Sequence, residues 1–267
     1  MTAPQHALLP DCRLHLHHGP IDLIIGVEGS KRNACYRAAC ERFATVLQGL
    51  VAELSDLRQP LQNTRFSDPI ARRMAQAVAP HGGVFVTPMA AVAGAVADEV
   101  LAAMITDHVP PKAYVNNGGD IALHLSGQRS FNARSPTADI TITAEESARG
   151  IATSGWRGRS HSLGIADAVT VLARTAATAD VAATLIANAV DVPGHPAVSR
   201  QPASALSPDS DLGERLVTTD VGPLPAADIA KALSGGAKVA QNMMNRGHIL
   251  QAILSLQGQT NEVPLDL

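Results

Sequence analysis

The chain has 267 residues, of which 46% are hydrophobic but only 3% are aromatic, so its core must consist mainly of aliphatic side chains. Its net charge of −3 and the lack of a basic stripe argue against a nucleic-acid-binding protein. No apolar run reaches the roughly 18 residues that a membrane span needs, because Asp98 and Glu99 interrupt residues 84–105. The three cysteines lack the spacing of a metal knuckle, and the start of the chain lacks a secretory signal pattern. We therefore expect a cytoplasmic protein with reduced thiols, no membrane contact and no nucleic-acid partner.

The first part of the chain predicts two strands and a long helix. Residues 12–28 form two strands joined at Gly19-Pro20, the first with alternating polar and apolar side chains and the second almost wholly apolar. A helix is expected from near Ser30 to Gln59-Pro60, because apolar residues recur every three or four positions. The residues of this apolar face are Phe43, Leu47, Leu50, Leu54 and Leu57.

The rest of the chain alternates irregularly between the two kinds of element. Helices are expected over residues 68–79, 88–106, 176–189 and 226–245, and strands within 112–173 and over 248–256. The region 191–225 is rich in proline, serine, aspartate and glycine, which predicts a long, partly mobile excursion with one strand over 214–219.

This order of elements does not suit a doubly wound parallel sheet. It favours an α+β fold in which helices pack on one face of a mixed or antiparallel sheet. We expect a single domain over residues 1–267, with the excursion at about 191–225 as part of it.

A carboxylate and a hydroxyl share one face of the helix expected over 176–189. Asp180 and Thr184 are four residues apart, so both side chains point the same way. Hard oxygen donors of this kind suit Mg²⁺, which completes its shell with water and phosphate oxygens. A capping aspartate and a packed threonine are the alternative interpretation.

A second pattern joins two predicted strands. The run Asn116-Asn117-Gly118-Gly119-Asp120 supplies the residues that tolerate positive φ, and its glycines let a ligand approach the backbone closely. It also has the composition of an ordinary hairpin turn.

Hydroxyl groups and a histidine follow. Thr153-Ser154-Gly155 is a strand end that could hydrogen-bond phosphate or ribose, or only its own turn. His161, after Ser160, is a plausible acid or base near neutral pH and is the candidate catalytic residue, although most single histidines are structural.

In this order, and preceded by Gly94 and Asp98, these patterns resemble the ApbE-like superfamily, whose best-known members are flavin transferases. The resemblance implies a tunnel-fold-like α+β architecture. It implies Asp180 and Thr184 as Mg²⁺ ligands, and Asn117, Gly118, Gly119 and Asp120 as the lining of a site for FAD or FMN. It places Thr153, Ser154 and His161 at the reacting phosphate.

Three positions depart from the pattern of the transferases. Ala93 stands in place of a lysine, Trp156 in place of an aspartate, and Gly164 begins the pair that replaces Asp-Pro. A cation for phosphate would then have to come from Arg157 or Arg159.

Three functions therefore remain open. The protein acts on the phosphate linkage of a flavin nucleotide, binds the nucleotide without catalysis, or is a thiol-dependent enzyme of sulfur metabolism. A small-molecule nucleotide is the expected partner, and a homo-oligomer is possible because tunnel-like folds often complete their sheets with other copies.

Overall fold

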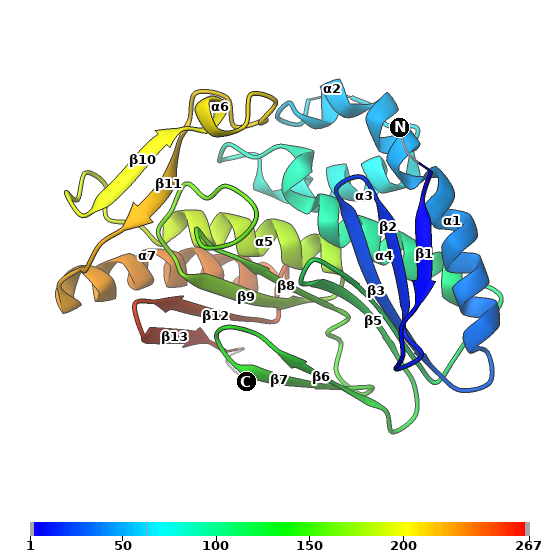
Figure 1. Ribbon diagram of the computed structural model, residues 1–267. Helices are drawn as coiled ribbons and strands as arrows, with labels where there is room; N and C mark the ends of the chain where they lie inside the picture. The colour runs from blue at the N-terminus through cyan, green and yellow to red at the C-terminus, as the bar shows by residue number, and fades with distance from the viewer. Residues whose placement is uncertain (1–2, 63, 265–267) are drawn as a thin grey trace.

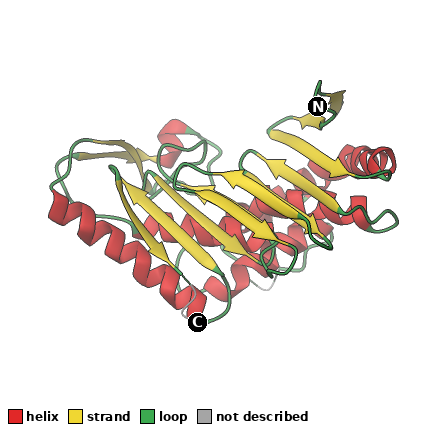
Figure 2. Ribbon diagram, turned by 90° about the horizontal axis from the view of Figure 1, so that it is seen from below, coloured by secondary structure: helices red, strands yellow, loops and turns green. Residues whose placement is uncertain are grey.

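The computed structural model describes residues 3–62 and 64–264. Its main feature is a nine-stranded sheet in the order β1-β2-β3-β4-β5-β8-β9-β12-β13, in which every neighbouring pair is antiparallel. The helices gather along one face of this sheet (Figure 2). The expected α+β class, with antiparallel sheet and helices on one face, is confirmed.

The strands of the sheet lie close to the expected positions. They are β1 (Gln5–Leu8), β2 (Leu14–His18), β3 (Ile21–Glu28), β4 (Lys112–Asn117), β5 (Asp120–Leu125), β8 (Gly150–Ser154), β9 (Ala168–Ala173), β12 (Gln251–Leu256) and β13 (Gln259–Val263). The sequence does not predict the two edge strands, β1 and β13, because both are short and show no apolar alternation. The remaining strands of the 112–173 region, β6 (Ser130–Arg134) and β7 (Asp139–Thr143), pair with each other and cover part of the other face of the sheet.

The helical layer consists of α1, α3, α4, α5 and α7 (Figure 1). Their bounds are α1 (Arg32–Ala52), α3 (Pro69–Val78), α4 (Val92–Ile105), α5 (Ala176–Ala189) and α7 (Ala226–Asn245). Two 3₁₀ turns, η1 (Ala79–His81) and η2 (Pro88–Ala91), follow α3 and precede α4. The core between sheet and helices is aliphatic and rich in alanine, as the composition indicated.

The first helix is shorter than predicted. It ends at Ala52, and a separate turn of helix, α2 (Leu54–Leu57), follows. The residue between them, Glu53, leaves the helical conformation, and its carboxylate accepts hydrogen bonds from the backbone of Ser67 and Asp68 at 2.7 and 3.1 Å. This tertiary contact interrupts an apolar pattern that is continuous in the sequence.

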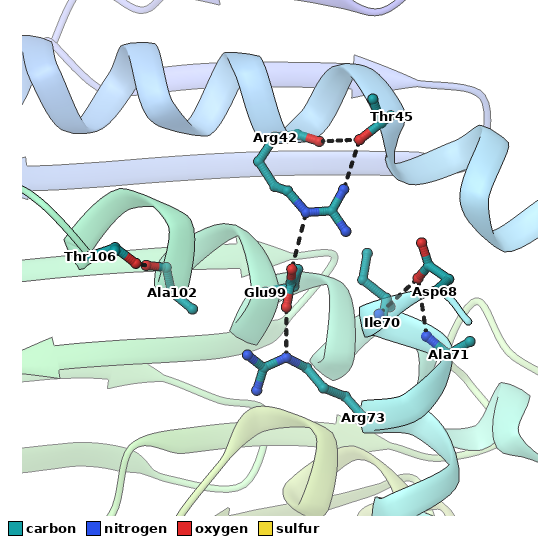
Figure 3. A network of polar contacts seen from close by, with 9 residues as sticks. All are labelled: Arg42, Thr45, Asp68, Ile70, Ala71, Arg73, Glu99, Ala102 and Thr106. Carbon is teal, nitrogen blue, oxygen red and sulfur yellow. Dashed lines mark hydrogen bonds and ion pairs between the residues drawn. The ribbon is translucent and has the colours of Figure 1, made fainter. Parts of the chain in front are cut away.

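An ion-pair network ties three helices together (Figure 3). The carboxylate of Glu99 in α4 accepts hydrogen bonds from Arg42 of α1 at 3.1 Å and from Arg73 of α3 at 2.8 Å. Asp68 caps α3 by accepting from Ile70 and Ala71, and Pro69 occupies the first turn as predicted.

The proline-rich region has more regular structure than the single strand expected there. It contains β10 (Val198–Pro202), α6 (Ala203–Leu206) and β11 (Leu216–Val221), and β10 pairs with β11 as a separate two-stranded sheet. The β10–β11 sheet accommodates proline because Pro202 is the last residue of β10, at the transition into α6.

One helical segment among the described residues has the length and apolar composition of a membrane span. It runs from Pro88 to Ile105, and half of it is buried inside the fold, where α4 packs against α1, α3 and α5.

Candidate functional site

A cavity of about 710 Å³ lies between the helical layer and the inner face of the sheet. One wall is apolar and comes from the β2–β3 turn, the end of α1, α2, η2 and the first turns of α4. Its members include Ile21, Leu47, Leu50, Val51, Leu54, Leu57, Met89, Val92 and Val96. The opposite side is polar and combines residues from β4, β5, β8, the loop after β8, and α5. These residues are Asn117, Asp120, Thr153, Ser154, Arg159, Ser160, Asp180 and Thr184.

The turn between β4 and β5 forms one part of the polar side. Asn117 pairs with Asp120 across a two-residue hairpin whose glycines, Gly118 and Gly119, have φ of +65° and +118°. Only glycine adopts these angles readily, so the turn depends on both residues. Gly118 lines the cavity, whereas Gly119 is in the turn but outside the lining.

Two side chains from this hairpin are fixed by backbone contacts. The amide of Asn117 donates to the carbonyl of Ala93 at 3.0 Å, and the backbone N–H of Thr153 donates to the Asp120 carboxylate at 3.3 Å. The hairpin is therefore attached to both α4 and β8.

Asp180 and Thr184 reach the same cavity from α5. The Asp180 carboxylate accepts a hydrogen bond from the backbone N–H of Gly94 at 3.0 Å. A Cβ on Gly94 would lie 2.3 Å from the carbonyl oxygen of Ala176, so only glycine allows α4 and α5 to approach this closely. Asp98 accepts from the backbone N–H groups of Ala176 and Ala177, at the start of α5. Gly94 and Asp98 thus serve to dock α5 on α4.

Both carboxylates on the polar side have raised pKa values. Burial raises the pKa of Asp120 to about 7. Burial and the neighbouring Asp120 charge raise the pKa of Asp180 well above its usual range, although hydrogen bonds from the backbone of Gly94 and Ala93 oppose the shift. A cation between these groups would remove the repulsion.

This donor set fits Mg²⁺ better than a metal that needs a complete protein cage. Within residues 3–62 and 64–264, no group of three or more His, Cys, Asp and Glu side chains is placed to hold a metal ion. Two carboxylates and the Thr184 hydroxyl form an incomplete set of hard oxygens, which is the arrangement that suits an ion sharing its shell with water and phosphate.

The end of β8 and the loop after it supply hydroxyls and a cation. The Thr153 hydroxyl is 2.9 Å from that of Thr170, which in turn accepts from Thr137. Arg157 donates to Asp167 at 2.8 Å and stacks on Trp156, so its charge is already used in the fold. Of the two arginines expected to replace the missing lysine, it is Arg159 that lines the cavity.

His161 does not meet the expectation that it faces the same cavity. It is outside the lining, and its Nε2 atom lies 3.1 Å from the hydroxyl of Ser207, in the loop after α6. The chain turns away from the cavity after Ser160, because the proline-rich excursion packs on this loop through the backbone bond from Thr218 to Ser162.

The sequence patterns did not predict that the apolar wall forms part of a site. Leu47, Leu50, Leu54 and Leu57 were assigned to the core face of one helix, but all four line the cavity. In the sequence, the signal of a second use is Val51, an additional apolar residue directly beside this face, and the fold leaves it exposed.

None of the three cysteines, all within the described residues, lines this cavity. Burial raises the pKa of the Cys35 and Cys40 thiols, which disfavours the reactive thiolate form.

Curated relatives of the chain include archaeal proteins. It is 38% identical over 141 residues to a UPF0280 protein of Methanopyrus kandleri, an alignment that covers 48% of this chain and 52% of the relative. It is 33% identical over 150 residues to a UPF0280 protein of Methanococcoides burtonii, covering 52% and 60% of the two chains. The matched part thus spans about half the length of these relatives.

Similar solved structures include the apbe protein of Thermotoga maritima, with 11% identity, a TM-score of 0.49, and coverage of 98% of this chain and 97% of that one. The flavinyl transferase ApbE of Pseudomonas stutzeri gives 11% identity, a TM-score of 0.47, and coverage of 98% and 94%.

A family model described as "AbpE bacteria" matches residues 6–262, which is nearly the whole chain. The resemblance drawn from the order of the motifs is thereby confirmed, and the protein belongs to the AbpE bacteria family.

Proposed function

We propose that the inner cavity, between the helices and the sheet, binds a flavin nucleotide together with Mg²⁺. The observation that carries this proposal is the convergence of Asn117, Asp120, Thr153, Asp180 and Thr184 on one cavity, although they come from separate elements. The order of these motifs is the one that the ApbE-like resemblance associates with a flavin nucleotide.

The two sides of the cavity suit the two parts of such a ligand. The aliphatic wall offers a surface on which a flat ring system can pack without polar penalty. The polar side offers Arg159 as a bidentate partner for phosphate oxygens and a bare backbone at Gly118 for close approach.

Asp180 and Thr184 would hold the metal ion, with the Asp120 carboxylate beside them. When bound, Mg²⁺ supplies neutralisation of phosphate charge and polarisation of the phosphate oxygens. The protein's own contribution is to keep these oxygens in place through the backbone N–H groups of Gly94 and Thr153.

The test is a titration of the full chain with FAD, followed by quenching of flavin fluorescence with and without Mg²⁺. We expect Mg²⁺ to tighten binding, Asp180→Ala to abolish that gain, and Thr184→Val to reduce it by about tenfold. The matched control is Thr178→Val, a change of the same kind in α5 at a half-buried threonine that contacts Thr175 and not the cavity. Equal FAD binding by wild type and Asp180→Ala at all Mg²⁺ concentrations would contradict the proposal.

Whether the protein also cleaves the phosphate linkage of the nucleotide is a second question. The placement of His161 favours a protein that binds the nucleotide without cleaving it. Its ring contacts Ser207 and lies outside the cavity lining, so the histidine implied for phosphoryl transfer does not face the cavity. Incubation of the protein with FAD, Mg²⁺ and water, followed by chromatography for FMN and AMP, distinguishes the two. Steady release of both products that is lost in Asp180→Ala would establish hydrolysis and overturn the binder.

A further inference from the structure

A second cavity, of about 560 Å³, lies on the opposite face of the sheet. We call it the outer cavity. It is bordered by the β1–β2 turn, the end of β3, the start of α1, β4, the start of β5, and β6. It shares no lining residue with the inner cavity.

The outer cavity concentrates positive charge in a protein whose net charge is −3. Four cationic side chains line it, against two carboxylates. The cations are Arg13, Arg32, Lys112 and Arg134, and the carboxylates are Asp11 and Glu28. A concave surface with an excess of one sign raises the local concentration of ligands of the other sign.

The cations differ in how far the protein already satisfies them. Arg13 pairs with Asp11 at 2.6 Å, Lys112 with Glu28 at 3.1 Å and Arg134 with Asp139 at 3.0 Å. These three carboxylates are about half exposed or more, with 54%, 46% and 76% of their side-chain surface accessible. Arg32 is half-buried; its Nε donates to the carbonyl of Val27 at 3.0 Å, and it forms no ion pair with any residue in the described part of the chain. Its guanidinium therefore keeps donors available for an anion.

Aromatic rings form the other part of the lining. Tyr114 and Phe131 lie with ring centroids 5.1 Å apart, and Lys112 Nζ is 5.7 Å from the centroid of Phe131. The ring of Tyr114 lies against Gly26, where a Cβ would be 2.3 Å from its Cε1 atom. The glycine thus allows a tyrosine to lie flat across β3, beside the cations.

We propose that the outer cavity binds a small phosphorylated aromatic compound, with Arg32 holding the phosphate and the Tyr114–Phe131 pair contacting the ring. An arginine fork matches phosphate oxygens bidentately, and the neighbouring cations add to the attraction. The site is independent of the flavin proposal, because it uses other residues on another face of the sheet.

The test is calorimetric titration of the full chain at low ionic strength with two probes, 4-nitrophenyl phosphate and inorganic phosphate. A background with both Arg58→Gln and Arg159→Gln removes the two cations that line the inner cavity. We expect saturable binding of 4-nitrophenyl phosphate with one site per chain, and binding of inorganic phosphate at least tenfold weaker because it lacks the ring. Arg32→Gln should weaken binding of 4-nitrophenyl phosphate by about tenfold or more. Phe131→Leu should reduce the preference for 4-nitrophenyl phosphate over inorganic phosphate.

The matched control is Arg65→Gln, at an exposed arginine outside the lining, which should leave binding unchanged. If Arg32→Gln does not fold, as judged by circular dichroism, Lys112→Gln is the second variant, and we expect it to weaken 4-nitrophenyl phosphate at least threefold. Absence of saturable binding to the parent protein overturns the proposal, and so does binding that neither variant weakens. Equal affinity for the two probes overturns the assignment of an aromatic ligand.

Discussion

The inner and outer cavities lie on opposite faces of the same β4–β5 hairpin, yet their side chains differ in charge balance and in kind. Asn117 and Asp120 face the inner cavity, whereas their neighbours Asn116 and Ile121 face the outer one. Each cavity is lined by two carboxylates, but the inner one adds hydroxyls and an aliphatic wall, whereas the outer one adds four cations and aromatic rings. The period of two along a strand separates adjacent residues into different sites, so a continuous run of sequence is not a continuous site.

The largest effect should come from the glycines that shape the two cavities. Gly94→Ala places a Cβ against the backbone of Ala176, which cannot move without shifting α5, and should cost about 3 kcal/mol of unfolding free energy. Gly26→Ala meets the side chain of Tyr114, which can turn aside, and should cost only about 1–2 kcal/mol. Thermal and urea unfolding measure both.

Gly82→Ala is the control for this pair, since a Cβ there meets no atom within 4 Å. If Gly26→Ala costs more unfolding free energy than Gly94→Ala, the surroundings of Gly26 are the more rigid, and our ranking of the two substitutions is wrong.

A smaller effect is expected from the network behind the inner cavity. Burial raises the pKa of Glu99, but hydrogen bonds from Arg73 and Arg42 outweigh it and hold the pKa below its usual range. The stability that this provides is present above the unfolded pKa and is lost as the pH falls through the folded one. Glu99→Gln should therefore cost about 1–2 kcal/mol at pH 7, and the difference from wild type should shrink in acid.

Urea unfolding at a series of pH values checks the Glu99 prediction, with exposed Glu145→Gln as the control. A loss of stability in Glu99→Gln that is independent of pH would show that the network acts through packing rather than charge.

The carboxylates of the inner cavity should show the opposite pH dependence. Because burial raises the pKa of Asp120 from 3.8 to about 7, the folded protein keeps a proton that the unfolded chain releases. The metal-free fold therefore loses stability as the pH rises from about 4 to about 7. Asp120→Asn should remove this loss. The difference between the Tm of the variant and the Tm of wild type should therefore increase from about pH 4 to about pH 7 and then level off.

Scanning calorimetry in the presence of a chelator measures this difference. The control is Asp139→Asn, at a residue whose side chain is 76% exposed, where the difference in Tm should not follow the pH in this way. A constant difference for Asp120→Asn would mean that Asp120 is ionised throughout.

The smallest effect is expected at His161. Since its ring contacts Ser207 outside the inner cavity, His161→Ala should change FAD affinity by no more than about twofold. Arg159→Gln, in the lining, should weaken it by about tenfold. Fluorescence titration compares the two, and the reverse order would mean that His161 reaches the ligand in solution.

Local sequence patterns were sufficient to predict the structure where a residue's surroundings follow from the helix or strand that contains it. The helices over 176–189 and 226–245 and the strands of 12–28 were predictable from periodicity and from proline and glycine signals. The common face of Asp180 and Thr184 followed from their spacing on α5, and the hairpin at Gly118-Gly119 followed from its need for positive φ.

Contacts between distant residues decided the rest. No local signal tells that Glu53 breaks the first helix by accepting from Ser67 and Asp68, or that the excursion draws His161 toward Ser207. The sequence by itself determined which elements form and which oxygen donors they carry. The tertiary structure decided which of these donors meet, and that Arg159 rather than Arg157 remains available to a ligand, because hydrogen bonds and close packing between segments far apart in the chain depend on the assembled layers.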